Sequence, residues 1–336
     1  MAQPRITVVI PTYSRAEYLR VAIQSVLEQT YADFDLLVSD DASTDHTAEV
    51  VASFKDARLR YHRHPRNIGI TPNWRFALTE PQTEFVAPLA DDDYYLPHHL
   101  ETALRAIEHY PQATYYTCVA EYFGDEKASG VNRPVAITDV QTPLLYFPPT
   151  AAVEFLGIDN PGPINCMLCR RAALHPDLFW GPPGYLPNDL LIMTQLMAQH
   201  GFVFGNQPGY RFRVHATNTS LSTERKKLWR FNLMVWQGIR WLHNFLIAQG
   251  LATPESIEQH GITSPHEQHV VPLVLALASF DANASQRAIG ERIFRHRADM
   301  DRVSARFRIA RALGYWTFPV SERLTQWRLG WPSQNV

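Results

Sequence analysis

The stretch that decides the fold is ITVVIPTYSR, which occupies residues 6–15. It begins as a continuous apolar, β-branched run, the pattern of a strand buried on both faces, and Pro11 ends that run. Apolar residues then recur at helical spacing over residues 18–27. A buried strand followed directly by an amphipathic helix indicates the first unit of an α/β fold.

The same alternation continues along the chain. We expect strands over residues 34–38, 58–62, 84–89 and 114–119, and helices over 44–54, 72–78 and 97–110, with Ser43 as the N-cap of the 44–54 helix. This alternation predicts a mostly parallel, Rossmann-like sheet flanked by helices. Ligands of such sheets bind beyond the carboxyl ends of the strands, so the polar residues that follow each strand form the candidate site.

The pattern weakens between Gly124 and Gly162, where Pro, Thr and Gly predict long loops of the kind that carry acceptor specificity. Beyond these loops we expect a strand over residues 164–169, a helix over 189–199, and one or two strands over 202–214 broken between Gly205 and Gly209. The remainder reads as helical, near residues 222–250, 265–280 and 284–317. The predicted domains are an α/β domain over 1–221, with a donor-binding half (1–110) and an acceptor and catalytic half (111–221), and an all-helical region over 222–336.

The start of the chain lacks the charged-then-apolar order of a signal peptide, and three cysteines are too few for a disulfide framework. No stretch reaches the roughly 18 uninterrupted apolar residues that a membrane span needs. We therefore expect a cytoplasmic protein.

The carboxyl-terminal end of the chain is basic and aromatic. Residues 281–336 hold ten arginines against five acidic residues. Arginine and aromatic enrichment is typical of protein interfaces and of helices on membrane surfaces. We expect a protein contact here, either with the catalytic domain or in a homo-oligomer, and peripheral contact with the inner face of the membrane is the alternative. Nucleic acid is not an expected partner.

Acidic residues gather at three predicted strand ends: Asp40 with Asp41, the run Asp91–Asp93, and Asp189. Adjacent carboxylates repel one another, so three in a row after an apolar strand favour a neutralising cation. A hard cation held by one or two carboxylates keeps coordination positions for phosphate oxygens, so Mg²⁺ or Mn²⁺ is expected. The alternative, that Asp91–Asp93 only cap the following helix, stays open on the residues alone.

Four motifs in a fixed order carry a resemblance to a known family. They are VIPTYSR at residues 9–15, VSDDASTD at 38–45, NIG at 67–69 and LADDD at 89–93. Together they closely resemble family 2 glycosyltransferases of the GT-A fold over about residues 5–110, with weaker signals to about residue 222. The resemblance implies a metal-dependent, inverting transferase that moves a sugar from a nucleoside-diphosphate sugar, with UDP or dTDP favoured, to a hydroxyl of a glycan or lipid-linked acceptor. Its expected role is the synthesis of a surface polysaccharide or glycoconjugate.

Carried over by position, the resemblance implies a nucleotide site in the first half of the chain. An ionised carboxylate only accepts hydrogen bonds, so Asp40 suits the N3–H of a uracil or thymine ring. The implied nucleoside pocket is lined by Pro11, Thr12 and Tyr13, with further nucleotide contacts from Arg15, Arg66 and Asn67.

The third motif departs from the family's Asp-X-Asp pattern. If Pro97 fixes the register, Ala90 stands where the first Asp is usual, and the metal-binding position falls on Asp92. Asp91 then lies near the ribose or the metal, with Asp93 alongside. A slip of one residue would move the metal to Asp93, and that alternative stays open.

Two later segments complete the implied site. The sequence YRFRVH at residues 210–215 resembles the family's Tyr-Arg-x-His signature with one extra residue, which implies His215 at the metal or diphosphate and Arg211 or Arg213 on phosphate oxygens. Asp189 is the expected general base for the acceptor hydroxyl. Asn188 replaces the Glu that the family usually shows before this Asp, so we expect the pKa of Asp189 to be less raised than in relatives.

The sequence also bears on two other classes of function. The departures at Ala90 and Asn188 leave open a catalytically silent nucleotide-sugar-binding or scaffolding subunit. A dinucleotide oxidoreductase would need a Gly-x-Gly-x-x-Gly turn after the first strand, and PTYSR stands there instead. The dinucleotide-binding class is therefore excluded.

Overall fold

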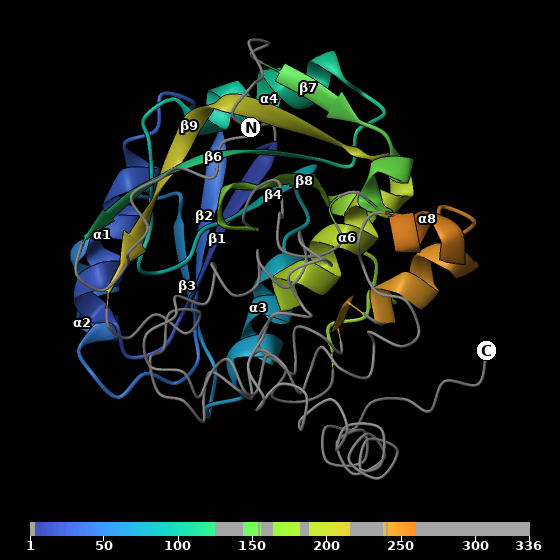
Figure 1. Ribbon diagram of the computed structural model, residues 1–336. Helices are drawn as coiled ribbons and strands as arrows, with labels where there is room; N and C mark the ends of the chain where they lie inside the picture. Colours follow the sequence, from blue (N-terminus) through green and yellow to red (C-terminus); the bar gives the residue numbers. More distant parts are fainter. Residues whose placement is uncertain are drawn as a thin grey trace, which may run out of the picture. The chain divides into compact units, whose positions relative to one another are not determined.

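The computed structural model of the chain describes residues 4–124, 144–153, 155, 164–181, 188–215, 238–239 and 241–259 (Figure 1). The chain forms two compact units. The first comprises Met1–Ala152, Asn160–Trp180 and Ile192–His215, and the second comprises Val153–Asp159, Gly181–Leu191 and Ala216–Val336. The predicted domain boundary at residue 221 stays a proposal.

The first four long strands form the parallel half of one sheet. They lie in the order β3 (Leu59–Arg63), β2 (Phe34–Asp40), β1 (Ile6–Thr12) and β4 (Phe85–Pro88), and each neighbouring pair is parallel. Every residue of β1 is buried, because this strand has a neighbour on each side and helices over the sheet. The apolar, β-branched composition of residues 6–10 therefore matches its position at the centre.

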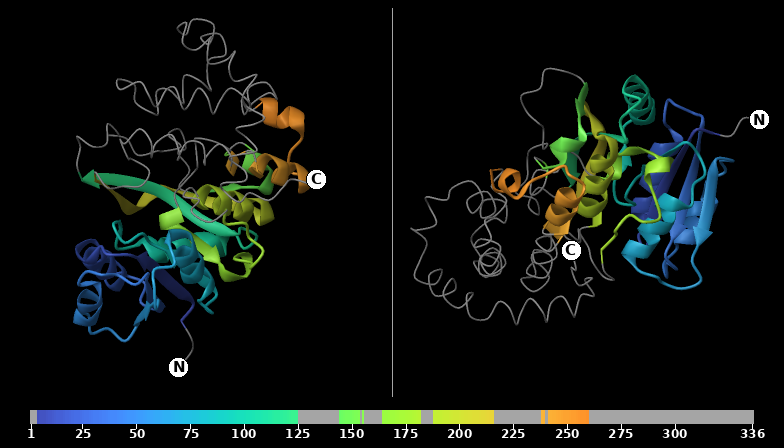
Figure 2. Two further views of the ribbon diagram at one scale, coloured as in Figure 1. Left: turned by 90° about the horizontal axis from the view of Figure 1, so that it is seen from below. Right: turned by 90° about the vertical axis from the view of Figure 1, so that its right-hand side faces the viewer.

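Helices cover both faces of this half of the sheet (Figures 1 and 2). Helix α1 (Ala16–Leu27) and helix α2 (Thr47–Ser53) contact each other, and α3 (Ile70–Thr79) packs against β1 and β2. The chain crosses from β1 to β2 to β3 in one direction and returns over the sheet to β4. Since such crossovers are right-handed, α3 lies on the face opposite α1 and α2.

The second half of the sheet is mixed. It continues from β4 through β8 (Leu168–Arg170), β6 (Tyr115–Gly124) and β9 (Phe202–Val214) to β5 (Tyr94–Tyr95), with β7 (Leu144–Phe147) also paired to β9. Strands β6 and β9 are parallel, whereas β8 is antiparallel to both of its neighbours and β5 and β7 are antiparallel to β9. Helix α4 (His99–His109) packs on β6 and β9. The predicted α/β class with a Rossmann-like half is confirmed, with a mixed rather than purely parallel second half.

Residues 202–214 form one long strand, so the predicted break between Gly205 and Gly209 takes the form of an irregularity. The register with β6 shifts on both sides of Val119. A Cβ at Gly209 would lie 2.3 Å from Nδ1 of His99 and 2.6 Å from Sγ of Cys118. Glycine is needed here because the strand passes close to buried side chains, which is a common reason for glycine inside a strand.

Two further predictions of local structure were wrong. Ser43 is not the N-cap of α2, because its hydroxyl donates to Asp40 and accepts from the Ser14 amide, and the helix begins at Thr47. The segment predicted as a strand over 164–169 instead begins as a 3-10 turn, η2 (Ile164–Cys166), and only Leu168–Arg170 pairs as a strand.

The remaining elements are short or lie near the edge of the described chain. They are η1 (Pro149–Val153), η3 (Arg171–Ala173), α6 (Asn188–His200) and α8 (Pro254–Gln259). Residues 241–248 are helical, within the helix predicted near 222–250, and the segments predicted near 265–280 and 284–317 lie outside the described residues. Among the helices that the structure describes, none combines the length and the apolar character that crossing a bilayer requires.

Candidate active site

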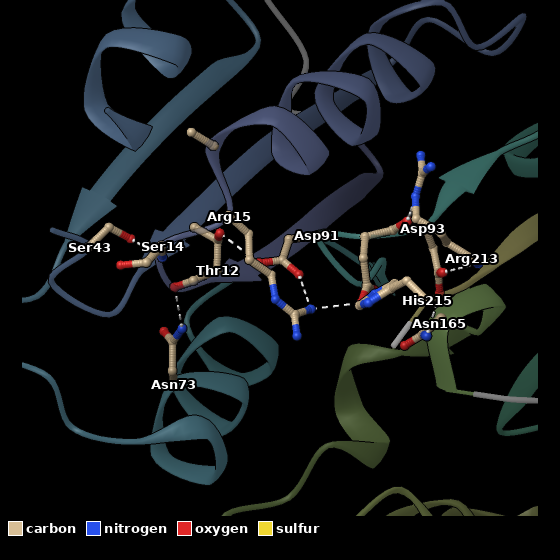
Figure 3. A network of polar contacts seen from close by, with 12 residues as sticks. Thr12, Ser14, Arg15, Ser43, Asn73, Asp91, Asp93, Asn165, Arg213 and His215 are labelled. Carbon is tan, nitrogen blue, oxygen red and sulfur yellow. Dashed lines mark hydrogen bonds and ion pairs between the residues drawn. The ribbon is translucent and has the colours of Figure 1, made fainter. Parts of the chain in front are cut away.

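The strand register brings three polar loops to one edge of the sheet. Thr12 pairs with Asp40 at the ends of β1 and β2, and Leu89, which follows β4, still donates its amide to the carbonyl of Val9. Asp91 therefore comes next to the end of β1, where its Oδ2 accepts a 2.7 Å hydrogen bond from the Thr12 hydroxyl (Figure 3). The carboxyl edge is where ligands of α/β sheets bind.

Arg15 supplies a positive charge to the acidic run. It stands just before α1, and its Nη1 lies 3.1 Å from Oδ1 of Asp91 and 2.7 Å from Oδ2 of Asp92. Burial by itself lowers the pKa of Arg15, but the charges and hydrogen bonds of the two carboxylates outweigh burial and raise it. Burial raises the pKa of Asp91 to about 6, against the opposing effect of Arg15. The site thus concentrates negative charge in a place with little water.

His215, which directly follows β9, contacts the carboxylate of Asp92. Its Nε2 lies 3.0 Å from Oδ2 of Asp92, and its ring stacks on Tyr18 with the centroids 5.2 Å apart. Helix α1 thus orients the imidazole of His215, because the ring of Tyr18 on this helix stacks against it. Among the predicted ligands, Asp92 and His215 converge on one point although they are 123 residues apart in sequence.

Both carboxylate oxygens of Asp93 accept hydrogen bonds from other groups of the protein. Its Oδ1 accepts the amide of Arg213 at 2.8 Å, and its Oδ2 accepts the side-chain amide of Asn165, also at 2.8 Å. The carboxyl is almost completely buried, and burial and the Asp92 charge raise its pKa well above the usual range. Of the two candidate metal-binding residues, Asp92 and Asp93, the geometry favours Asp92. Both oxygens of Asp93 already accept hydrogen bonds, which link β9 and Asn165 to the loop.

The donor set at Asp92 fits a divalent cation held by few protein ligands. One carboxylate oxygen and one imidazole nitrogen meet, and the guanidinium of Arg15 contacts the same oxygen. Within the part of the chain that the structure describes, no three His, Cys, Asp or Glu side chains form a cluster able to hold a metal. A cation held by this one carboxylate and one imidazole would keep several positions for other oxygen ligands, as Mg²⁺ and Mn²⁺ sites that bind phosphates do.

The predicted nucleoside side of the site centres on Asp40. This carboxylate is fully buried, and Ser43 and Tyr61 donate to its two oxygens, with Nε of Arg63 at 3.6 Å from Oδ2. Asp41, which the sequence reasoning left without a role, accepts the amides of Ile68 at 2.6 Å and Gly69 at 2.9 Å. Asp41 thereby fixes the 67–69 motif beside the end of β2.

The other predicted nucleotide residues differ in exposure. Pro11 and Thr12 are buried at the end of β1, and Tyr13 is 46% exposed directly after them. Arg66 and Asn67 are both exposed in the loop that Asp41 holds. An exposed aromatic ring at a strand end has the chemistry for stacking on a base.

The two arginines of β9 have different surroundings. Nε of Arg211 donates to Glu121 at 2.6 Å and its Nη1 donates to the Tyr94 hydroxyl at 2.8 Å, so it is paired on the neighbouring strands. Nε of Arg213 donates to the backbone carbonyl of Asp92 at 2.9 Å, and its guanidinium lies over the Tyr18 and Phe123 rings. Of the two, Arg213 is the one beside the acidic run.

Asp189 lies in the second compact unit, in the first turn of α6. Its side chain is exposed to solvent, and its Oδ1 accepts the amide of Leu190 at 2.9 Å. Surrounding protein raises the pKa of Asp189 by desolvation, while the Leu190 hydrogen bond opposes that rise. The exposed side chain is accessible to a substrate hydroxyl.

Sequence reasoning missed three residues that build the site. Asn165 donates to Asp93 and Tyr18 stacks on His215. Asn73 links the ends of β2 and β1 by donating to the carbonyls of Ser39 at 3.0 Å and Thr12 at 3.5 Å. Asn165 falls inside the segment predicted as a strand over residues 164–169 and carries no motif. Tyr18 and Asn73 fall inside predicted helices. Residue spacing predicts which face of a helix a side chain lies on, but it does not predict which residue that side chain contacts.

Fold and site together define a class, an α/β protein of the GT-A type with its charged residues at the strand ends. The chain belongs to glycosyl transferase family 2, because the sequence model of that family matches residues 7–175, half of the chain. The resemblance to this family that the four motifs carry is therefore confirmed.

Curated relatives each match about a third of the chain and less than half of their own length. The GalNAc(5)-diNAcBac-PP-undecaprenol beta-1,3-glucosyltransferase of Campylobacter jejuni is 31% identical over 36% of this chain and 40% of its own length. The UDP-Glc:alpha-D-GlcNAc-diphosphoundecaprenol beta-1,3-glucosyltransferase WfgD of Escherichia coli is 33% identical over 29% of this chain and 38% of its own. An uncharacterized glycosyltransferase of Rickettsia felis, 33% identical, is matched over only 17% of its length.

Solved structures show the fold over most of the chain. S. aureus TarS 1-349 in complex with UDP-GlcNAc superimposes with a TM-score of 0.55 at 16% identity, over 86% of this chain and 91% of that one. The mannosyltransferase PcManGT of Pyrobaculum calidifontis, in complex with GDP-Man and Mn²⁺, gives a TM-score of 0.53 at 17% identity, over 94% of this chain and 88% of that one. At these identities the likeness establishes the GT-A fold.

Proposed function

We propose that the chain transfers a sugar from a nucleoside-diphosphate sugar to a hydroxyl of a lipid-linked glycan, with inversion at the anomeric carbon and with the help of Mn²⁺ or Mg²⁺. The observation that carries the proposal is the meeting of Asp92 and His215 beside Asp91 at the carboxyl edge of the sheet. A cation bound there would supply charge stabilisation for the departing diphosphate.

The chain's own groups have distinct parts in this proposal. Tyr13, Asp40 and the 67–69 loop would bind the nucleoside, while Asp92 and His215 would hold the cation. Arg213, beside the acidic run, would add positive charge for the phosphates. Asp189 would take the proton of the acceptor hydroxyl as its oxygen attacks the anomeric carbon from the face opposite the diphosphate.

The names of the relatives support the choice of substrates. Two of them are beta-1,3-glucosyltransferases whose names specify undecaprenol diphosphate-linked acceptors, and one of these names UDP-Glc as the donor. A β product from an α-linked nucleotide sugar is the outcome of a single displacement. UDP is accordingly the first donor nucleotide to test, dTDP the second, and a polyprenyl diphosphate-linked sugar the first acceptor.

The proposal is tested by a transfer assay on the full chain. Labelled UDP- and dTDP-sugars are offered with a polyprenyl diphosphate-linked monosaccharide, with Mn²⁺, with Mg²⁺ or with EDTA. We expect a lipid-linked disaccharide that forms with either metal and is absent with EDTA. Nucleotide binding without transfer to any acceptor in the panel would instead favour a silent binding subunit.

A further inference from the structure

The carboxylate oxygen proposed to bind the metal contacts a guanidinium and an imidazole of the protein itself. Oδ2 of Asp92 receives Nη1 of Arg15 at 2.7 Å and Nε2 of His215 at 3.0 Å. A carboxylate oxygen offers two lone-pair directions, so these two groups occupy both of them. A divalent ion on this oxygen would also lie within a few ångströms of the guanidinium and be repelled by it.

We propose that Arg15 is a built-in counter-cation that occupies the metal position, and that the diphosphate of the donor opens this position by drawing the guanidinium to itself. The inference rests on the proposed function and adds to it the order in which the metal and the nucleotide bind. The donor-free protein binds metal poorly, and metal and nucleotide enter together.

The placement of Arg15 suits such an exchange. It follows β1 directly and precedes α1, and the beginning of a helix after a parallel strand is the usual location of phosphates in α/β proteins. Its side chain is 30% exposed, so a ligand can reach it. Both contacts to the carboxylates run through the single nitrogen Nη1, whereas a phosphate can take the guanidinium fork through two parallel hydrogen bonds.

The charges explain why Arg15 is present. Asp91 and Asp92 are 6% and 8% exposed, and two buried carboxylates without a counter-ion would strongly destabilise the fold. Arg15 therefore stabilises these buried carboxylates, and by the same contacts it would compete with a divalent ion. In the proposal, the Arg15 guanidinium must leave before the metal binds, and the donor diphosphate removes it. Such a group couples the affinities of the two ligands.

The experiment measures Mn²⁺ binding to the full chain by electron paramagnetic resonance of the free ion, without nucleotide and with saturating UDP. Arg15→Gln should bind Mn²⁺ at least about tenfold more tightly than the parent in the absence of UDP, within the usual range of coupling between sites. The enhancement by UDP should shrink by a similar factor. Arg15→Lys, which keeps a cation, should bind Mn²⁺ as weakly as the parent.

Two controls make the result specific. Arg213→Gln removes a positive charge that contacts the backbone carbonyl of Asp92 and leaves the carboxylate paired with Arg15, so it should gain little Mn²⁺ affinity. Arg20→Gln removes a half-exposed arginine on α1 that pairs with Glu17 and should change nothing. Arg15→Met, which keeps the aliphatic stem, replaces Arg15→Gln if the latter does not fold.

An equal gain in Arg213→Gln, no gain in Arg15→Gln, or tight Mn²⁺ binding by the parent without UDP would each overturn the role of Arg15. Failure of the proposed function has a different signature. The parent would then bind neither UDP nor Mn²⁺ under any condition, and Arg15→Gln would not acquire Mn²⁺ binding.

Discussion

At the scale of single residues, the run Asp91–Asp93 divides into carboxylates of different character. Asp92 shares one oxygen between a guanidinium and an imidazole, whereas both oxygens of Asp93 are bound by an amide of the backbone and an amide of Asn165. A cation can replace side-chain donors at Asp92 more readily than it can replace the backbone donor at Asp93. The two neighbours therefore make a matched pair for mutation.

We expect Asp92→Asn to abolish transfer and the effect of Mn²⁺ on nucleotide affinity while the protein stays folded. Asp93→Asn should keep the Mn²⁺ effect and lose about 1–3 kcal/mol of stability, because an amide replaces the acceptor that faces Asn165. Calorimetric titration with UDP and urea unfolding measure the two effects. The opposite assignment, with Asp93 as the metal ligand, would reverse the two outcomes.

Asp40 is the second residue whose role can be isolated. Asp40→Ala should weaken nucleotide affinity by about 1.5–3 kcal/mol, the range for a hydrogen bond that involves a charged group. Tyr61→Phe serves as the control, since it removes the hydroxyl that donates to Oδ2 of Asp40 and keeps the carboxylate. Equal calorimetric affinities of parent and Asp40→Ala would refute a contact between Asp40 and the base.

Asp189 tests the acid–base step. Asp189→Asn should bind donor and metal like the parent but transfer sugar at least roughly a hundredfold more slowly, the lower end of what a general base contributes. Because desolvation raises the pKa of this carboxyl, the parent should lose activity on the acidic side at a pH above the usual Asp value. Single-turnover transfer at saturating donor measures both effects, and a variant as fast as the parent would rule this base out.

At the scale of elements, the irregular pairing between β6 and β9 depends on glycine. We expect Gly209→Ala to cost about 1–3 kcal/mol of unfolding free energy, since the new methyl overlaps the His99 ring and the Cys118 sulfur. In a His99→Ala background the same substitution should cost less, because the nearest atom is gone. Urea unfolding of the four proteins gives the comparison, and an unchanged cost would contradict the steric explanation.

The elements that sequence could predict are those whose signal is local. β1 was predicted because its buried residues are consecutive and β-branched, and α6 because its helical pattern is continuous from residue 189 to 199. The start of α2 was misplaced because Ser43 is a good capping residue that the structure uses elsewhere, as a partner of Asp40. Asp45, two residues later, accepts the Thr47 amide at 3.1 Å.

The candidate site also divides into features that local sequence motifs predict and features that depend on residues far apart in the sequence. Motif order predicted Asp91, Asp92 and His215, which the fold brings together with Thr12 and Arg15. The contact of Arg15 with two carboxylates, and the occupation of Asp93 by Asn165, depend on side chains about 70 or more residues apart. Such pairings follow from strand register and packing, which a single sequence does not display.

At the scale of the whole molecule, the basic region beyond residue 281 lies outside the described residues, and its role stays a proposal. We expect a protein contact, seen as a homo-oligomer by light scattering or as packing on the catalytic domain. Sedimentation with anionic vesicles tests the alternative, because arginine-rich aromatic helices bind such surfaces. A monomer that stays in the supernatant would exclude an external role in either form.

The central claim is that one edge of the sheet binds a nucleoside diphosphate together with a divalent cation. The most direct measurement is the calorimetric affinity of the full chain for UDP with Mn²⁺ and with EDTA. The account predicts that Mn²⁺ tightens UDP binding at least about tenfold, a coupling of the usual size between two ligands that share a site. Equal UDP affinity with and without Mn²⁺ would contradict it.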